Sequence, residues 1–234
     1  FSGGEPKRYA EIMGCTEKEF YKVTNTIRKC MEIKKKNNLE TTIGMQMVLM
    51  PQHKDQLSPL AKLGKELGVD YLVIKHCSDD EMGSLGINYR DYHDIVDDIK
   101  AAEKLSTDTY KVVPKWSKLL SEGKRVYQRC YGPPFILQMS GSSLVAPCGM
   151  LFHERYKEDF HIGNIAEQSF KDIVRGDRYW QVINHLSSEK FNAQKMCGAL
   201  CLQHKVNERL YYLVEHGIPI PEPKGEKPLH VNFI

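Results

Sequence analysis

The sequence predicts an α/β chain, with a βα sheet or barrel over its first half and a small α+β domain over its second half. Helical periodicity alternates with short apolar runs in the order helix, strand, helix, strand, helix, strand up to about residue 115. This alternation is typical of parallel strands that are joined by right-handed crossovers. Beyond residue 116 the alternation stops, and a hairpin signal is followed by several short helices.

In the first half, helices are predicted where apolar positions recur at helical spacing. They cover residues 16–37, 57–67 and 92–105. Thr16 and Glu19 form a capping-box pattern at the start of the first helix, and Gly68 is expected to end the second. Strands are predicted at short runs rich in β-branched and apolar residues. These runs cover residues 41–49, 69–74 and 110–113.

In the second half, the sequence predicts a β-hairpin around Ser140-Gly141-Ser142-Ser143 and three helices. The two strands of the hairpin cover residues 135–139 and 144–146, and the helices cover residues 167–175, 178–186 and 201–215. We divide the chain into a first domain (1–120), a second domain (121–216) and an extended tail (217–234) that is rich in Pro and Lys.

The composition excludes several classes of protein. The 234 residues are 41% hydrophobic with a net charge of +3, which is unlike a disordered chain and offers no dominant basic face for nucleic acid. No apolar run approaches the length of a membrane span. The opening FSGGEPKRYA lacks the apolar region of a signal peptide, so we expect a cytoplasmic protein with reduced thiols.

Four of the seven cysteines fall in the second half, and their positions suggest a metal site. Cys130 and Cys148 flank the predicted hairpin. Cys197 and Cys201 are expected to form a helical or turn pair, and on a helix their spacing would place both sulfurs on one side. Spacing alone leaves three interpretations open: buried apolar thiols, a four-Cys zinc site, or an iron–sulfur cluster. Zinc prefers two close pairs, whereas clusters accept more scattered cysteines, and this favours iron–sulfur.

The same region resembles a known family. The run 130–135 (CYGPPF), the hairpin end 145–148 (VAPC), the segment 162–165 (IGNI) and the final cysteine pair occur in the order found in the SPASM or twitch domain of radical S-adenosylmethionine enzymes. The resemblance covers about residues 127–205. It implies an auxiliary [4Fe–4S] cluster with Cys130, Cys148, Cys197 and Cys201 as ligands. The pattern is closer to the four-Cys twitch form than to the seven-Cys SPASM form, so a second auxiliary cluster is not expected.

The first half is similar, less specifically, to the C-terminal half of the partial βα barrel that holds S-adenosylmethionine in that family. The C-x3-C-x2-C motif of the catalytic [4Fe–4S] cluster is absent, because Cys15, Cys30 and Cys77 lack that spacing. Either residues ahead of Phe1 carry this cluster, or the chain cannot cleave S-adenosylmethionine. The start at Phe1 favours the first interpretation, and the present chain alone is expected to be inactive.

Residues 2–5 (SGGE) spell the Gly-Gly-Glu motif that contacts the methionyl amino group of S-adenosylmethionine in this family. The following sequence departs from the family pattern, and Phe1 and Ser2 could instead end a later strand that faces the cofactor. Ser2 is a candidate cofactor contact in both placements, and Glu5 in only one. The alternative is a glycine-rich turn into a helix.

Lys75 and His76 follow the predicted strand 69–74, at the carboxyl edge where βα folds bind ligands. They are candidate substrate contacts, and the alternative is a solvated loop with the acidic residues 79–81.

The resemblance implies an oxidoreductase or maturase in which a deoxyadenosyl radical removes a substrate hydrogen atom. The auxiliary cluster would transfer electrons or bind substrate, and an external electron donor would be needed. A sugar, an aminocyclitol or a peptide is the implied substrate. The competing hypothesis is a non-catalytic module in which the four cysteines hold structural zinc.

Overall fold

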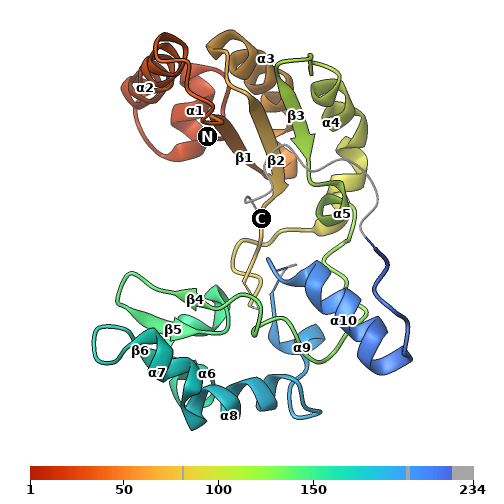
Figure 1. Cartoon of the computed structure of the whole chain (residues 1–234). Helices are drawn as coiled ribbons and strands as arrows, with labels where there is room; N and C mark the ends of the chain where they lie inside the picture. Colours follow the sequence, from red (N-terminus) through yellow and green to blue (C-terminus); the bar gives the residue numbers. More distant parts are fainter. Residues whose placement is uncertain (81, 199–200, 223–234) are drawn as a thin grey trace. The chain divides into compact units, whose positions relative to one another are not determined.

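The computed structural model describes residues 1–80, 82–198 and 201–222. It is a mixed α/β structure in two compact units (Figure 1). Unit 1 contains Phe1–Cys77 and Ile87–Glu122, and unit 2 contains Ser78–Gly86 and the chain from Gly123 onward. None of the helices in the described ranges combines the length and the apolar content that a membrane span requires.

Unit 1 is built on a three-stranded parallel sheet with the strand order β1-β2-β3. The strands are β1 (Gly44–Leu49), β2 (Tyr71–His76) and β3 (Lys111–Pro114). Leu72 in the central strand lies opposite Met45 on one side and Val112 on the other, and all three side chains are buried. The three strands predicted for this region are confirmed, with boundaries that differ by one to three residues.

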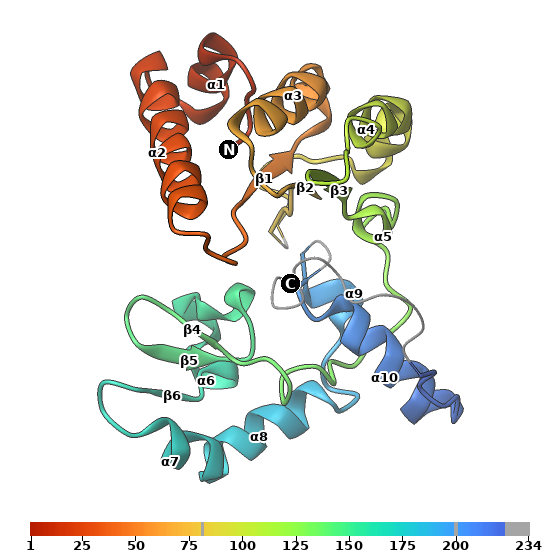
Figure 2. The same ribbon diagram turned by 45° about the horizontal axis from the view of Figure 1, so that its top comes forward.

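The helices of unit 1 lie along the sheet. They are α1 (Pro6–Met13), α2 (Glu17–Lys36), α3 (Leu57–Leu67), α4 (Val96–Glu103) and the short α5 (Trp116–Leu119), with 3₁₀ segments η1 (Pro51–Gln56) and η2 (Tyr89–Ile95). Figures 1 and 2 show α2, α3 and α4 side by side along one side of the strands. Leu60 of α3 and Ile99 of α4 are fully buried and belong to the same apolar core as Leu49 and Ile74 of the strands.

Two features of unit 1 differ from the sequence expectations. The helix predicted over 92–105 is a 3₁₀ segment followed by α4, and Asn88 begins the 3₁₀ segment by accepting a hydrogen bond from the N–H of Arg90. The capping box at Thr16 is not formed, because the Thr16 side chain makes no capping hydrogen bond. Propensity and spacing predicted where these helices begin, but tertiary contacts decide the detailed geometry of their first turns.

Unit 2 contains a small antiparallel sheet with the order β4-β5-β6 and a set of short helices. The strands are β4 (Gln138–Met139), β5 (Leu144–Ala146) and β6 (Gly163–Asn164). The helical segments are η3 (Gly149–Phe152), η4 (Glu154–Tyr156), α6 (Lys157–Phe160), α7 (Phe170–Arg175), α8 (Asp177–Leu186), α9 (Ala193–Met196) and α10 (His204–His216). The predicted hairpin is therefore present, but its first strand is shorter than expected.

The turn chemistry explains that shorter strand. The N–H of Phe135 donates to the carbonyl of Gly132 and the N–H of Ile136 to that of Pro133, so turns occupy the residues that precede β4. The Phe135 side chain is exposed. Similarly, α7 begins later than predicted because Ser169 caps it, with its hydroxyl accepting from the N–H of Asp172.

Candidate metal centre

The four cysteines predicted as ligands line one enclosed cavity in unit 2. Cys130 lies in the loop before β4, Cys148 starts η3, Cys197 ends α9, and Cys201 precedes α10. The remaining lining residues are predominantly apolar: Pro133, Pro147, Met150, Leu151, Leu186, Phe191, Met196 and Gln203. Within the described ranges, no group of three or more His, Cys, Asp or Glu residues forms a single-ion site. The thiols therefore border an apolar space and are not gathered around one point.

Of the helical or turn pair that the spacing of Cys197 and Cys201 allowed, the structure does not show the helical form. Cys197 has an extended backbone (φ −103°, ψ 144°) directly after α9, and Cys201 stands ahead of α10, so the two do not share a helix. Residues 199–200, within the segment that the prediction treated as helical, lie outside the described residues. Both side chains border the same cavity because the segments before α10 return to it.

Gln203 holds together the two loops that precede Cys148. Its Nε2 donates to the carbonyl oxygen of Ile136 at 2.6 Å and to that of Pro147 at 3.0 Å. The Gln203 side chain is buried, and a Cβ atom added to Gly132 would clash with its Oε1. A glycine at position 132 is therefore required for this close approach.

Arg125 holds the segment around Cys197 in a similar way. Its guanidinium donates to the carbonyl oxygens of Ala193 at 2.6 Å, Cys197 at 3.3 Å and Gly198 at 2.7 Å. The forked guanidinium therefore joins the backbone before Cys197 to the backbone after it. It also places a permanent positive charge near a group that must be anionic to bind metal.

Burial raises the pKa of three of the thiols. The pKa rises to about 12 at Cys130, where a hydrogen bond from Asn207 opposes the burial, and to about 11 at Cys148. The pKa of Cys197 rises to about 12, although the charge of Arg125 opposes the effect of burial. The charges of neighbouring thiolates add to each of these shifts. These three thiols are protonated at neutral pH when no metal is bound, so a bound metal must displace their protons.

The predicted cofactor contacts Ser2 and Glu5 lie in unit 1. Ser2 is buried, and its hydroxyl donates to the carbonyl of Val48 at 3.3 Å. The Glu5 carboxylate accepts from Nε2 of Gln56 at 3.4 Å. Both residues therefore have structural partners in β1 and η1.

The glycine pair between these two residues has a packing role. A Cβ atom at Gly3 would lie 2.6 Å from Cα of Tyr9, and one at Gly4 would clash with the backbone at Leu60. The turn leads directly into α1. The segment is thus a glycine-rich turn into a helix, and contact of Ser2 and Glu5 with S-adenosylmethionine stays a prediction.

The sequence places Lys75 and His76 just after a predicted strand. In the structure they are the last two residues of β2. Burial lowers the pKa of Lys75, and the charges of Lys118 and Lys115 lower it further. Burial also lowers the pKa of His76 to about 4, with smaller contributions from Lys118 and Lys75. His76 is therefore neutral at pH 7.

The neutral His76 should make the stability of unit 1 depend on pH. Tyr89 and Tyr92 contact its ring at centroid distances of 5.9 and 6.4 Å, and the charges of Lys118 and Lys75 oppose its protonation. Because the pKa is about 4 in the folded state and about 6.5 in an unfolded chain, protonation favours unfolding between these values. We expect a loss of about 3 kcal/mol as the pH falls from 7 to 4. Urea unfolding as a function of pH measures it.

The matched variants are His76→Asn and His93→Asn. The first should flatten the pH dependence of the free energy of unfolding between pH 4 and 6.5. The second makes the same substitution at a side chain that is 44% exposed and controls for the substitution itself. Equal slopes in the wild type and His76→Asn would contradict the assignment.

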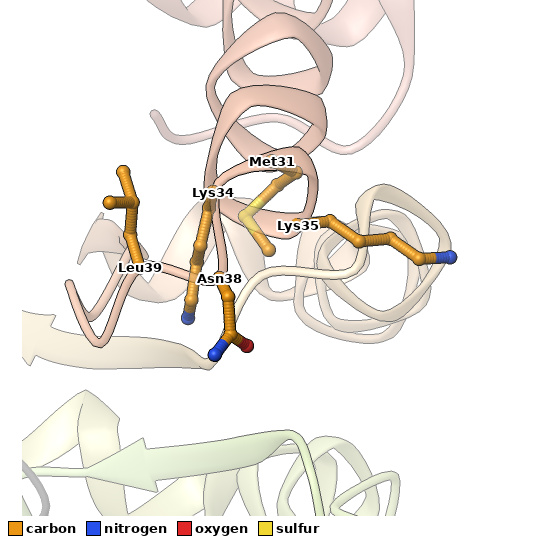
Figure 3. A pocket seen from close by; sticks show the side chains of 5 residues that line it. All are labelled: Met31, Lys34, Lys35, Asn38 and Leu39. Carbon is orange, nitrogen blue, oxygen red and sulfur yellow. The ribbon is translucent and has the colours of Figure 1, made fainter.

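Three further hollows among the described residues have no cysteine in their linings. One, of about 220 Å³ at the end of α2, is lined by Met31, Lys34, Lys35, Asn38 and Leu39 (Figure 3). It has no cysteine, histidine or carboxylate in its lining, and Lys34 is bound to Asp70 at 2.6 Å. A larger hollow of about 670 Å³ in unit 2 lies beside β6.

Sequence reasoning missed Arg125, Gln203 and Asn207, which support the cysteine loops. A signal for two of them was present, because Gln203 and Asn207 are four residues apart at the start of a predicted helix that follows Cys201. Polar amides on one stripe beside a cysteine could have been recognised as supports. Nothing in the local sequence marks Arg125, whose partners are 68 to 73 residues away.

Comparison with known proteins identifies the segment that carries the cavity. No curated protein and no solved structure matches the chain. A family model does match, and the matched segment contains Cys148, Cys197 and Cys201, while Cys130 lies five residues ahead of it. Residues 135–201 match the SPASM family, an iron–sulfur cluster-binding domain.

Proposed function

We propose that this chain is part of a radical S-adenosylmethionine enzyme and that its unit 2 holds an auxiliary [4Fe–4S] cluster. The observation that carries the proposal is the enclosed apolar cavity lined by four cysteines, three of them inside the SPASM match. SPASM domains are typical of radical S-adenosylmethionine maturases that carry auxiliary clusters.

The donor set fits a cluster well. Cys130 and Cys148 come from separate loops and Cys197 and Cys201 from the ends of two helices, and Fe–S clusters accept such scattered thiolates. Structural zinc sites instead favour two close pairs at fixed spacing. A structural zinc module is therefore the second candidate. Its support is that four thiolates can also bind zinc.

The arrangement of the thiolates favours electron transfer over substrate binding. Four cysteines can ligate every iron of a four-iron cluster, which leaves no iron position for a substrate. The lining of Leu186, Phe191 and other apolar side chains excludes water from the site. When bound, the cluster supplies one-electron chemistry.

Unit 1 takes the role of a half barrel in this proposal. Its parallel sheet would place Lys75 and His76 at the carboxyl edge beside a sugar, aminocyclitol or peptide substrate, with Ser2 and Glu5 near S-adenosylmethionine. The C-x3-C-x2-C motif is not among the 234 residues, so the radical step requires residues outside them. An external donor in the cytoplasm would provide the electrons.

Metal and sulfide analysis of the anaerobically purified chain tests the proposal. We expect about four irons and four sulfides per chain and absorbance near ~400 nm. One zinc per chain without colour would reject the cluster and establish the structural zinc module. A full-length protein that holds the cluster but does not cleave S-adenosylmethionine would limit the proposal to its iron–sulfur part.

A further inference from the structure

Asn207 in α10 is fully buried, and its side chain hydrogen-bonds to the predicted ligand Cys130. Its Oδ1 accepts hydrogen bonds from the N–H groups of Tyr131 at 2.6 Å and Gly132 at 2.9 Å. Its Nδ2 lies 3.5 Å from Sγ of Cys130. One side chain therefore fixes the loop after Cys130 and contacts the sulfur itself.

The network determines which way the Asn207 amide faces. Two backbone N–H groups converge on one side of it, and only the carbonyl oxygen can accept them. The NH₂ group must then face Cys130, where it can only donate. A donor aimed at a sulfur stabilises a thiolate more than a neutral thiol.

We propose that Asn207 is a positioning residue that holds the Cys130 loop and raises the reduction potential of the cluster. The inference rests on the proposed cluster in unit 2. Reduction adds negative charge to the cluster and its sulfur ligands, and a hydrogen bond to a sulfur stabilises the more negative state. A second support lies one turn earlier, where Gln203 donates to the carbonyls of Ile136 and Pro147 beside the same cavity.

Two substitutions separate the electrostatic effect from simple support. Asn207→Asp retains an oxygen for Tyr131 and Gly132 but places a carboxylate beside Cys130 in place of a donor. Asn207→Ala removes both functions without adding charge. A purely structural role predicts that Ala is the more damaging change. Our proposal predicts a lower reduction potential in both variants, and the lowest in Asp.

The experiment is a redox titration of the anaerobically reconstituted chain, followed by EPR of the reduced cluster. At a fixed ambient potential, the ratio of reduced to oxidised cluster in Asn207→Asp should fall about tenfold, which is ~59 mV for one electron. Asn184→Asp, an identical change at an exposed position of α8, should leave the ratio unchanged. Equal potentials in the wild type and Asn207→Asp would overturn the inference.

A measurement on the wild-type protein covers the case in which neither variant folds. Labelling asparagine side chains with ¹⁵N should produce a nitrogen hyperfine coupling to the reduced cluster in pulsed EPR. If the protein contains the cluster but the coupling is absent, the inferred role of Asn207 is overturned while the proposed function stands. Absence of iron and sulfide in the wild type would instead reject the proposed function.

Discussion

Replacement of Cys148 by alanine is expected to remove the iron–sulfur centre. The iron content should fall from about four per chain to near zero, and the absorbance near ~400 nm should disappear. Cys148 borders the cavity directly, and it lies within the segment that matches the SPASM domain. The apolar lining offers no other anionic side chain that could replace its thiolate.

The control is the same change at Cys15, whose side chain is exposed in unit 1. Cys15→Ala should retain the full complement of iron and sulfide. Iron analysis of both variants after identical anaerobic reconstitution provides the comparison. Equal iron contents would show that Cys148 is not a ligand.

Loss of the centre should also weaken unit 2 as a whole. The cysteine sulfurs join the apolar core of this unit, with Cys130, Cys148 and Cys197 packed against it. Metal binding to a site that forms only in the folded state contributes directly to folding free energy. The reconstituted wild type should therefore unfold at a higher temperature than Cys148→Ala. Cys15→Ala should unfold at the same temperature as the wild type.

The elements that the sequence predicted well are those with a local cause. The apolar run around Leu72 becomes the central strand β2, and Gly68 ends α3 with a left-handed backbone (φ 73°). The hairpin forms around Ser140, whose N–H donates to the carbonyl of Leu144. Periodicity and turn residues carry this information within a few positions of one another.

The features that the sequence did not reveal depend on distant partners. Helix α1 begins at Pro6 and ends at Gly14, as familiar rules for helix ends allow. The sequence offered this helix only as an alternative, because its apolar positions are few. The close approach of Gly4 to Leu60 joins residues that are 56 positions apart. The same holds for the site, because spacing can suggest four ligands but cannot identify the side chains that hold their loops.

Arg125 is the support whose loss should cost the most stability. Its guanidinium satisfies three carbonyl oxygens, those of Ala193, Cys197 and Gly198, in the segment that closes the cavity. In Arg125→Met, each of these acceptors loses a charged donor, and each loss should lower the free energy of unfolding by about 1 kcal/mol or more. We expect the free energy of unfolding of unit 2 to fall by about 3 kcal/mol.

The contrast with Arg129 identifies the cause of that loss. Arg129 also carries a full charge, but its partners Glu189 and Glu215 are side chains near the surface, so Arg129→Met should have little effect. Arg125→Lys keeps the charge without the fork of donors, and its stability should lie between those of the wild type and Arg125→Met. Urea unfolding measures all three variants. If Arg125→Met were as stable as Arg129→Met, the carbonyl contacts would be incidental, and the segment around Cys197 would have to be held by its apolar neighbours alone.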